Sequence, residues 1–263
     1  MLKKDMTIKT GIAGCGALGG IVAGALVEGI DGYELIGISD IRKPPFDVPL
    51  MDFEELAEKA DLVIECLPPK EVPKLARIVL KKNKRLVLIS AAALLLYPEI
   101  ETWAAGSEGR IIVPSGALSG LDAVSALNCA GIQSAKIRST KPPKGFTGAP
   151  YVVQEQIDLD AITEKTKLFE GNALEAARAF PANVNVAASL SLAGIGPEKT
   201  RVEVWADPDI RGNSHEITVS GERSTITSKV ENTPDPANPK SSMLAGYSIV
   251  AWLKKQNAKI AGA

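Results

Sequence analysis

The feature that most constrains the fold is a glycine-rich turn near the start of the chain, in the stretch GIAGCGALGG. An apolar run typical of a strand, residues 7–13, leads into this turn, and an apolar helix-like run follows it. Glycines at these positions permit a tight strand-to-helix turn, close approach of a pyrophosphate and close helix–strand packing. The following helix offers unpaired N–H groups and a positive dipole end to phosphates. The residues predicted to hold a dinucleotide here are Gly14, Gly16, Ala17, Leu18 and Gly19.

An acidic residue closes the second predicted strand, YELIGISD, at Asp40. This is about the offset at which a carboxylate would accept hydrogen bonds from an adenosine ribose. Asp40 therefore favours NAD as the cofactor. Arg42 and Lys43 come directly afterwards and would suit a 2′-phosphate, so NADP stays open.

Helix-like and strand-like stretches then alternate as far as residue 115, and the strands are continuously apolar. Such alternation is typical of a parallel sheet covered on both faces, a Rossmann-type doubly wound α/β domain over residues 1–115. Ligands of these sheets bind beyond the carboxyl ends of the strands. Segments 66–68, 90–92 and 114–116 should therefore surround the nicotinamide, with Cys66 and Ser90 lining it. Cys66 has no basic neighbour in sequence, so it is not predicted to be a nucleophile.

The pattern changes after residue 115. Helices are predicted over residues 118–131 and 171–194, and the second is broken at Pro181. A strand is predicted from residue 132, and three strands with a period of two residues follow between residues 200 and 230. This favours an α+β catalytic or dimerisation domain over residues 116–240 with a mostly antiparallel sheet. A last helix within residues 241–263 is expected to pack back on the first domain. Asn183 precedes a helical run and is predicted to be its N-cap.

Composition excludes several classes of protein. The 30 basic and 31 acidic residues nearly cancel, so nothing favours binding to nucleic acid or to an anionic membrane surface. Three scattered cysteines without CxxC spacing are predicted to be buried thiols in a reducing compartment, and no metal site is expected. The apolar runs are too short for a bilayer and the start of the chain lacks a signal-peptide core, which predicts a cytoplasmic protein.

Five stretches carry a more specific signal: GIAGCGALGG, VPSGALSGLDA, RSTKPPKG, FPANVNVAASLSLAGIG and ADPDIRGNSHEITVSGE. In this order and spacing the chain resembles the L-aspartate dehydrogenase family. The resemblance implies a homodimer that uses NAD or NADP to oxidise L-aspartate to iminoaspartate. The iminoaspartate would either hydrolyse to oxaloacetate and ammonia or supply NAD biosynthesis. The resemblance further implies His215 as the active-site residue and nicotinamide contacts from Asn185 and Ser119. Two positions depart from the family pattern: Ser119 replaces a usual alanine and Ala92 a common glycine.

His215 is the single histidine of 263 residues and lies at the start of a predicted strand. One interpretation is a solvated strand-end residue. The other is an acid/base group facing the cofactor cleft, because oxidation of an amine requires a base whose pKa lies near the working pH. Only histidine has an unperturbed pKa, about 6.5, in that range.

A dicarboxylate substrate also requires cations, and the stretch STKPPKG supplies Lys141 and Lys144 with hydroxyl groups at Ser139 and Thr140. Lys141 is the better candidate because Pro142 restricts the backbone beside it. Both lysines could instead be solvated loop charges. The residues assigned to the substrate are Ser115, Ser139 and Lys141.

Two other functions remain open. The chain could be an NAD(P)-linked reductase or dehydrogenase acting on another small amino acid or imine. An aspartate-semialdehyde dehydrogenase would need a catalytic cysteine, and none of the three cysteines has the surroundings of one. The chain could also be a non-catalytic NAD(H)-binding redox sensor.

Overall fold

The computed structural model describes residues 7–233 and 242–260, which form two compact units. The first unit contains the described residues up to Ser90, residues Tyr97–Pro114 and the end of the chain from Ala245. The second contains residues Ala91–Leu96 and the described part of Ser115–Leu244. Most of the predicted loop 231–240 and both ends of the predicted helix 241–263 lie outside the described residues.

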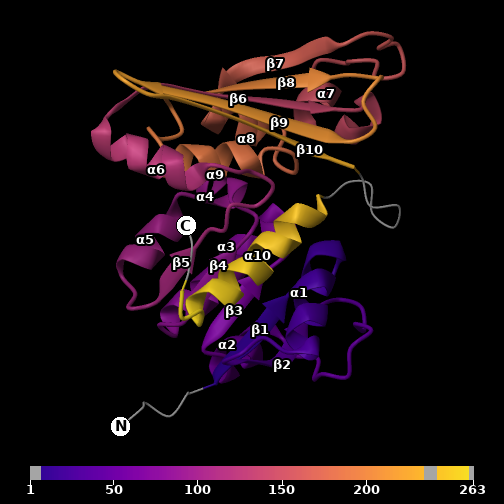
Figure 1. Ribbon diagram of the computed structural model, residues 1–263. Helices are drawn as coiled ribbons and strands as arrows, with labels where there is room; N and C mark the ends of the chain where they lie inside the picture. The colour runs from indigo at the N-terminus through magenta and orange to yellow at the C-terminus, as the bar shows by residue number, and fades with distance from the viewer. Residues whose placement is uncertain (1–6, 234–241, 261–263) are drawn as a thin grey trace. The chain divides into compact units, whose positions relative to one another are not determined.

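A parallel sheet with strand order β2-β1-β3-β4-β5 forms the centre of the first unit (Figure 1). The reversal of order at β1 is the doubly wound arrangement predicted from the alternating sequence. The strands are β1 (Ile8–Ala13), β2 (Tyr33–Ser39), β3 (Leu62–Glu65), β4 (Arg85–Leu88) and β5 (Arg110–Ile112). The helices are α1 (Ala17–Glu28), α2 (Phe53–Lys59), α3 (Val72–Lys81) and α5 (Glu99–Ala105), with a 3₁₀ turn at Pro69–Glu71.

Helix α10 (Met243–Gln256) contributes to the core of this same unit from Ala245 onward. Its apolar residues Ile249 and Leu253 are fully buried in one cluster with Ile12 of β1 and Val22 of α1. Burial of such side chains stabilises a fold by roughly 1.5–3 kcal/mol each. The last helix is therefore an integral part of the first unit.

The second unit is built on a sheet of strand order β10-β9-β6-β8-β7, in which only the β6–β8 pair is parallel. The prediction of a mostly antiparallel sheet is confirmed. The strands are β6 (Ile132–Lys141), β7 (Thr166–Asn172), β8 (Thr200–Ala206), β9 (Asn213–Gly221) and β10 (Thr225–Asn232). The helices are α4 (Ala92–Leu96), α6 (Leu121–Ala130), α7 (Pro150–Gln154), α8 (Ala173–Ala179) and α9 (Asn185–Ala193), with a 3₁₀ turn at Pro143–Phe146.

Helices cover one face of this second sheet, where α6, α8 and α9 contact its strands (Figure 1). Side chains alternate accordingly along β8: Val202 and Val204 are buried, whereas Arg201 is exposed. The same alternation in β6 places Ile137 and Ser139 on the helix-covered face and Arg138 on the outer face.

Three elements escaped the sequence analysis: α4, α7 and β7. Helix α4 lies in the uninterrupted apolar run LVLISAAALLL, where no periodicity separates a helix from a strand. Helix α7 spans only Pro150–Gln154, and β7 is an edge strand with an irregular register between Lys167 and Phe169. Each gave too weak a local pattern to be recognised.

We expect Gly19→Ala to destabilise the protein by about 1–3 kcal/mol, because a Cβ at this position would lie 1.9 Å from the backbone oxygen of Gly14. Gly20→Ala is the matched control in the same helix, since its Cβ would meet nothing within 4 Å. Alanine there should stabilise the helix by roughly 0.5–1 kcal/mol. Urea unfolding of both variants measures the difference, and equal stabilities would show that the turn tolerates a side chain.

Candidate active site

The glycine turn is closed on one side and open on the other. Gly14 has φ 90°, and a Cβ there would lie 2.4 Å from the carbonyl oxygen of Cys66. Around Gly16, by contrast, a Cβ would meet nothing within 4 Å. Gly16 is also the N-cap of α1, and no side chain caps that helix end. The open side therefore presents free N–H groups with space for a pyrophosphate, so the turn fits a dinucleotide.

Asp40 lies at the end of β2 beside this turn. Its carboxylate accepts the backbone N–H groups of Cys15, at 2.6 Å, and of Arg42, at 2.8 Å. Partial burial raises the pKa of Asp40, but the hydrogen bonds from Arg42 and Cys15 outweigh it and the pKa is lowered overall. Asp40 thus keeps a fixed negative charge next to the glycine turn, as binding of a ribose hydroxyl requires.

A buried carboxylate that the sequence analysis did not single out joins the ends of β3 and β4. Glu65 is fully buried and accepts the backbone N–H groups of Leu67 at 2.6 Å, Ser90 at 3.0 Å and Ile89 at 3.1 Å. The hydroxyl of Ser90 donates to the carbonyl of Leu67 at 2.8 Å. These bonds fix the two segments predicted to line the nicotinamide. An acid inside an otherwise apolar strand, DLVIECLPP, was the available signal.

Two of the three cysteines have a raised pKa, and the third lies on the surface. Burial, and secondarily the charge of Glu65, raise the pKa of the Cys66 thiol well above its ordinary value, which excludes a nucleophilic role near neutral pH. Cys15 is half-buried, and burial and the charge of Asp40 raise its pKa. The expectation of three buried thiols was wrong for Cys129, which is exposed on α6.

In the second unit, the single imidazole is buried within the sheet. His215 is 4% exposed and lies on β9, between β10 and β6. Its Nδ1 lies 3.0 Å from the hydroxyl oxygen of Ser139, which is directly opposite on β6. The structure therefore contradicts the interpretation of His215 as a solvated strand-end residue. Ser139 fixes the orientation of the ring and occupies Nδ1.

Lys141 ends β6 two residues after Ser139 and is 7% exposed. Its ammonium donates to the side-chain oxygen of Asn183 at 2.8 Å. Asn183 was predicted to be a helix N-cap, which is wrong: α9 begins after Val184, and the Asn183 oxygen is bound to the ammonium. Within residues 7–233 and 242–260, Lys141 forms no salt bridge.

This burial has an energetic cost. It lowers the pKa of Lys141 from 10.5 to about 8, a difference that corresponds to about 3 kcal/mol. Burial, followed by the charge of Lys141, lowers the pKa of His215 to about 3. At neutral pH the described part of the chain therefore places here a neutral imidazole and a cation that it does not neutralise.

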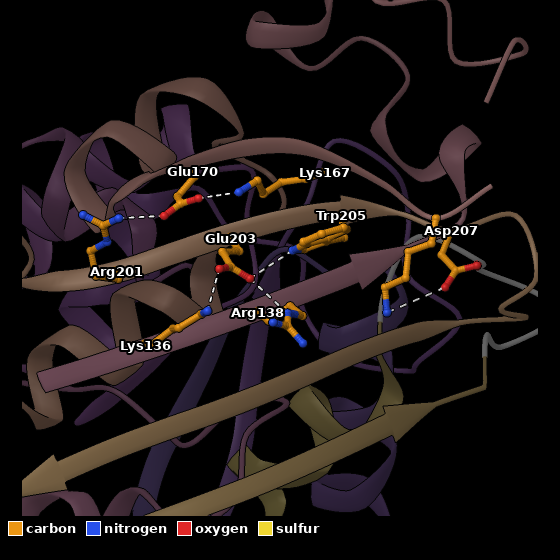
Figure 2. A network of polar contacts seen from close by, with 9 residues as sticks. Lys136, Arg138, Lys167, Glu170, Arg201, Glu203, Trp205 and Asp207 are labelled. Atoms are coloured by element: carbon orange, nitrogen blue, oxygen red, sulfur yellow. Dashed lines mark hydrogen bonds and ion pairs between the residues drawn. The ribbon is translucent and has the colours of Figure 1, made fainter. Parts of the chain in front are cut away.

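On the outer face of the same sheet, a buried charge has partners of the opposite charge, unlike Lys141 (Figure 2). Glu203 is 7% exposed and binds Lys136 at 2.5 Å, Arg138 at 2.9 Å and the indole N–H of Trp205 at 3.1 Å. Burial raises the pKa of Glu203, but these three donors outweigh it and lower the pKa to about 2. This acid is fully compensated by protein groups, whereas Lys141 on the helix-covered face is not.

Comparison with known proteins assigns the family. Residues 122–256 match the aspartate dehydrogenase C-terminal domain, and residues 14–114 match the NAD-binding domain of homoserine dehydrogenase. L-aspartate dehydrogenase 3 of Bordetella bronchiseptica is 41% identical over 95% of both chains. The chain belongs to the aspartate dehydrogenase family. These matches confirm the family indicated by the sequence motifs and the predicted NAD(P)-binding domain.

Other relatives agree with this membership. L-aspartate dehydrogenase of Bradyrhizobium diazoefficiens is 39% identical over 96% of this chain and 93% of its own length. The crystal structure of aspartate dehydrogenase from Thermotoga maritima superposes with a TM-score of 0.78 at 28% identity, covering 97% of this chain and 99% of that one. The similarity therefore extends over both units.

The other site residues predicted in the second unit differ in their exposure and in their hydrogen bonds. Asn185 accepts the backbone N–H of Ala92 at 3.0 Å, so its amide oxygen holds α4. The hydroxyl groups of Ser119 and Ser228 share a hydrogen bond. Ser115 is exposed. Of the other two candidates in STKPPKG, Lys144 is exposed and Thr140 lies on the opposite face of β6 from His215.

We expect Glu65→Gln to lower the free energy of unfolding by about 1–3 kcal/mol. Its amide NH₂ would confront backbone N–H groups that now donate to a carboxylate. Glu34→Gln, at an exposed position of the same unit, is the control and should change stability by less than about 0.5 kcal/mol. Chemical denaturation of both variants provides the comparison, and equal midpoints would argue against a positioning role for Glu65.

Proposed function

We propose that this chain oxidises L-aspartate to iminoaspartate with NAD or NADP. The observation that carries the proposal is a buried ammonium, Lys141, that has no carboxylate partner among the residues that the structure describes. It lies on the same sheet face as the only imidazole of the sequence, His215. The names of the relatives, L-aspartate dehydrogenases over 93% or more of their length, support the same substrate. Burial of an unpaired cation is costly, and a substrate carboxylate that supplies the counter-charge would account for it.

The chain's residues divide the work of this reaction. The turn Gly14–Gly19 and Asp40 would hold the pyrophosphate and ribose of the cofactor. When bound, the nicotinamide supplies a hydride acceptor for the substrate Cα. Lys141 would bind and orient a substrate carboxylate, with Asn183 holding the ammonium in place.

His215 would accept the proton that the substrate nitrogen loses as the imine forms. With Ser139 at Nδ1, the remaining nitrogen Nε2 is the one available for this transfer. As the hydride leaves Cα with two electrons, the nitrogen lone pair forms the C=N bond and the nitrogen proton moves to Nε2. Water hydrolyses the product to oxaloacetate and ammonia.

Several wider aspects remain predictions from the sequence and the family. They are a homodimeric assembly, a supply of imine to NAD biosynthesis and a cytoplasmic location. In the part of the chain that the structure describes, no helix has the length and apolar character needed to cross a membrane. Light scattering of the purified chain would decide the oligomeric state.

The assignment of His215 predicts that His215→Ala lowers turnover by roughly 10²- to 10⁴-fold, the usual loss when a general base is removed. The measurement is NADH or NADPH formation from L-aspartate, followed at 340 nm. Unchanged NADH binding and an unchanged unfolding midpoint serve as controls. Near-normal turnover in the folded variant would remove His215 from the reaction, and NADH binding without turnover of any amino acid by the unaltered protein would indicate a redox sensor.

The assignment of Lys141 predicts that Lys141→Met raises the KM for L-aspartate about 10- to 100-fold, as expected when a charge-assisted hydrogen bond of about 1.5–3 kcal/mol is lost. The unfolding free energy should rise, because an uncompensated buried charge is removed. Lys144→Met is the matched control, since Lys144 is exposed in the same segment. An unchanged KM for Lys141→Met would leave the lysine without a substrate role.

The same assignment fixes the direction of the pH dependence. The pKa of Lys141 in the free protein is about 8, so the ammonium is present below that pH and is lost above it. Inhibition by succinate, whose carboxylates stay ionised throughout, should therefore weaken about tenfold per pH unit above pH 8. Lys141→Met should remove this dependence.

A further inference from the structure

We propose that burial and the neighbouring charge of Lys141 keep the imidazole of His215 weakly basic in the free protein, and that a substrate carboxylate bound to Lys141 activates it as a base. This inference rests on the proposed function and adds a regulation of the same site. The base would thus be switched on by the substrate itself.

The first observation is the placement of the two groups on adjacent strands. His215 of β9 pairs with Ser139 of β6 in the antiparallel register, and Lys141 follows two residues later on β6. Because side chains alternate along a strand, all three lie on one face, and Lys141 is the diagonal neighbour of His215. Such neighbours are within reach of long side chains.

The second observation is that the neighbouring described strands place no other charge on this face around His215. Of the helices that contact β9 and β6, α9 carries no charged residue and α6 carries only the exposed Asp122. On the far side, β10 places Val230 opposite His215, with Ser228 and Asn232 two residues to either side. Within β9 the same face carries Asn213 and Ile217. The charged residues of these strands point to the opposite face: Glu216, Lys229, Glu231 and Arg138.

The third observation is that Lys141 has a neutral partner. The Asn183 oxygen at 2.8 Å satisfies one N–H of the ammonium but carries no charge to offset it. In the described residues, the ammonium is therefore the single charge that acts on the imidazole, and it adds to the effect of burial in lowering the pKa of His215. A carboxylate at Lys141 would cancel this repulsion and favour the imidazolium.

The proton balance of the reaction follows from this arrangement. The imidazole gains the proton from the substrate nitrogen and becomes positively charged. The carboxylate bound to Lys141 would offset the repulsion between this imidazolium and the Lys141 ammonium. An amine without a carboxylate at this position would leave the base inactive. The switch would thus contribute to substrate selection as well as to catalysis.

The single histidine makes the test direct. With ¹⁵N-labelled histidine, the imidazole signals of the folded protein belong to His215 alone. We expect the free protein to show no imidazolium at about pH 5, because the pKa of His215 is about 3. At the same pH, where succinate still carries a carboxylate charge, saturation with succinate should produce imidazolium, as a rise of about two pH units in the pKa of His215 requires. Lys141→Met without ligand should raise the titration midpoint by about one pH unit.

Lys144→Met serves as the control and should titrate like the unaltered protein, with and without succinate. An imidazole titration unaffected by bound succinate would overturn the proposal. So would a midpoint in Lys141→Met no higher than in the unaltered protein, a comparison that needs no succinate binding. Failure to oxidise L-aspartate would instead refute the proposed function, so the two failures are distinguishable.

Discussion

Each compact unit buries an ionisable side chain that forms no salt bridge with any residue in the described ranges, Glu65 in the first and Lys141 in the second, and the two groups are stabilised in different ways. Glu65 receives three backbone N–H groups, which offset part of the hydration that a carboxylate loses on burial, although burial still raises the pKa of Glu65. Lys141 receives a single amide oxygen. The first arrangement is complete without a ligand, whereas the second lacks an anion. This asymmetry supports the proposal that Lys141 binds the substrate carboxylate.

The second sheet illustrates the same difference on its two faces. On the outer face, Glu203 is surrounded by two cations and an indole N–H, so its charge contributes to stability. On the helix-covered face, burial lowers the pKa of Lys141, and burial together with the charge of Lys141 lowers the pKa of His215. Residues that a fold retains at a cost in stability are expected at functional sites. Glu203 of β8 and Lys141 of β6 therefore meet opposite surroundings, because alternation directs their side chains to different faces of the sheet.

In the first unit, packing determines where a ligand can approach. The carbonyl of Cys66 and the backbone of Gly14 exclude a side chain at Gly14 and at Gly19, while the space at Gly16 stays open. Asp40 binds the backbone of the turn itself, which fixes the turn relative to the end of β2. The carboxylate of Glu65 does the same for the segments after β3 and β4. The strand ends are thus organised by acids that accept backbone N–H groups.

The sequence by itself determined the doubly wound domain, the antiparallel character of the second sheet and the family, because these depend on local periodicity, glycine spacing and motif order. It also identified His215 and Lys141 as candidates by residue type. Only the tertiary structure decided that His215 is buried, that Asn183 binds Lys141 instead of capping a helix, and that Glu65 joins two strand ends. These contacts connect residues 24 to 76 positions apart, so no local pattern could reveal them.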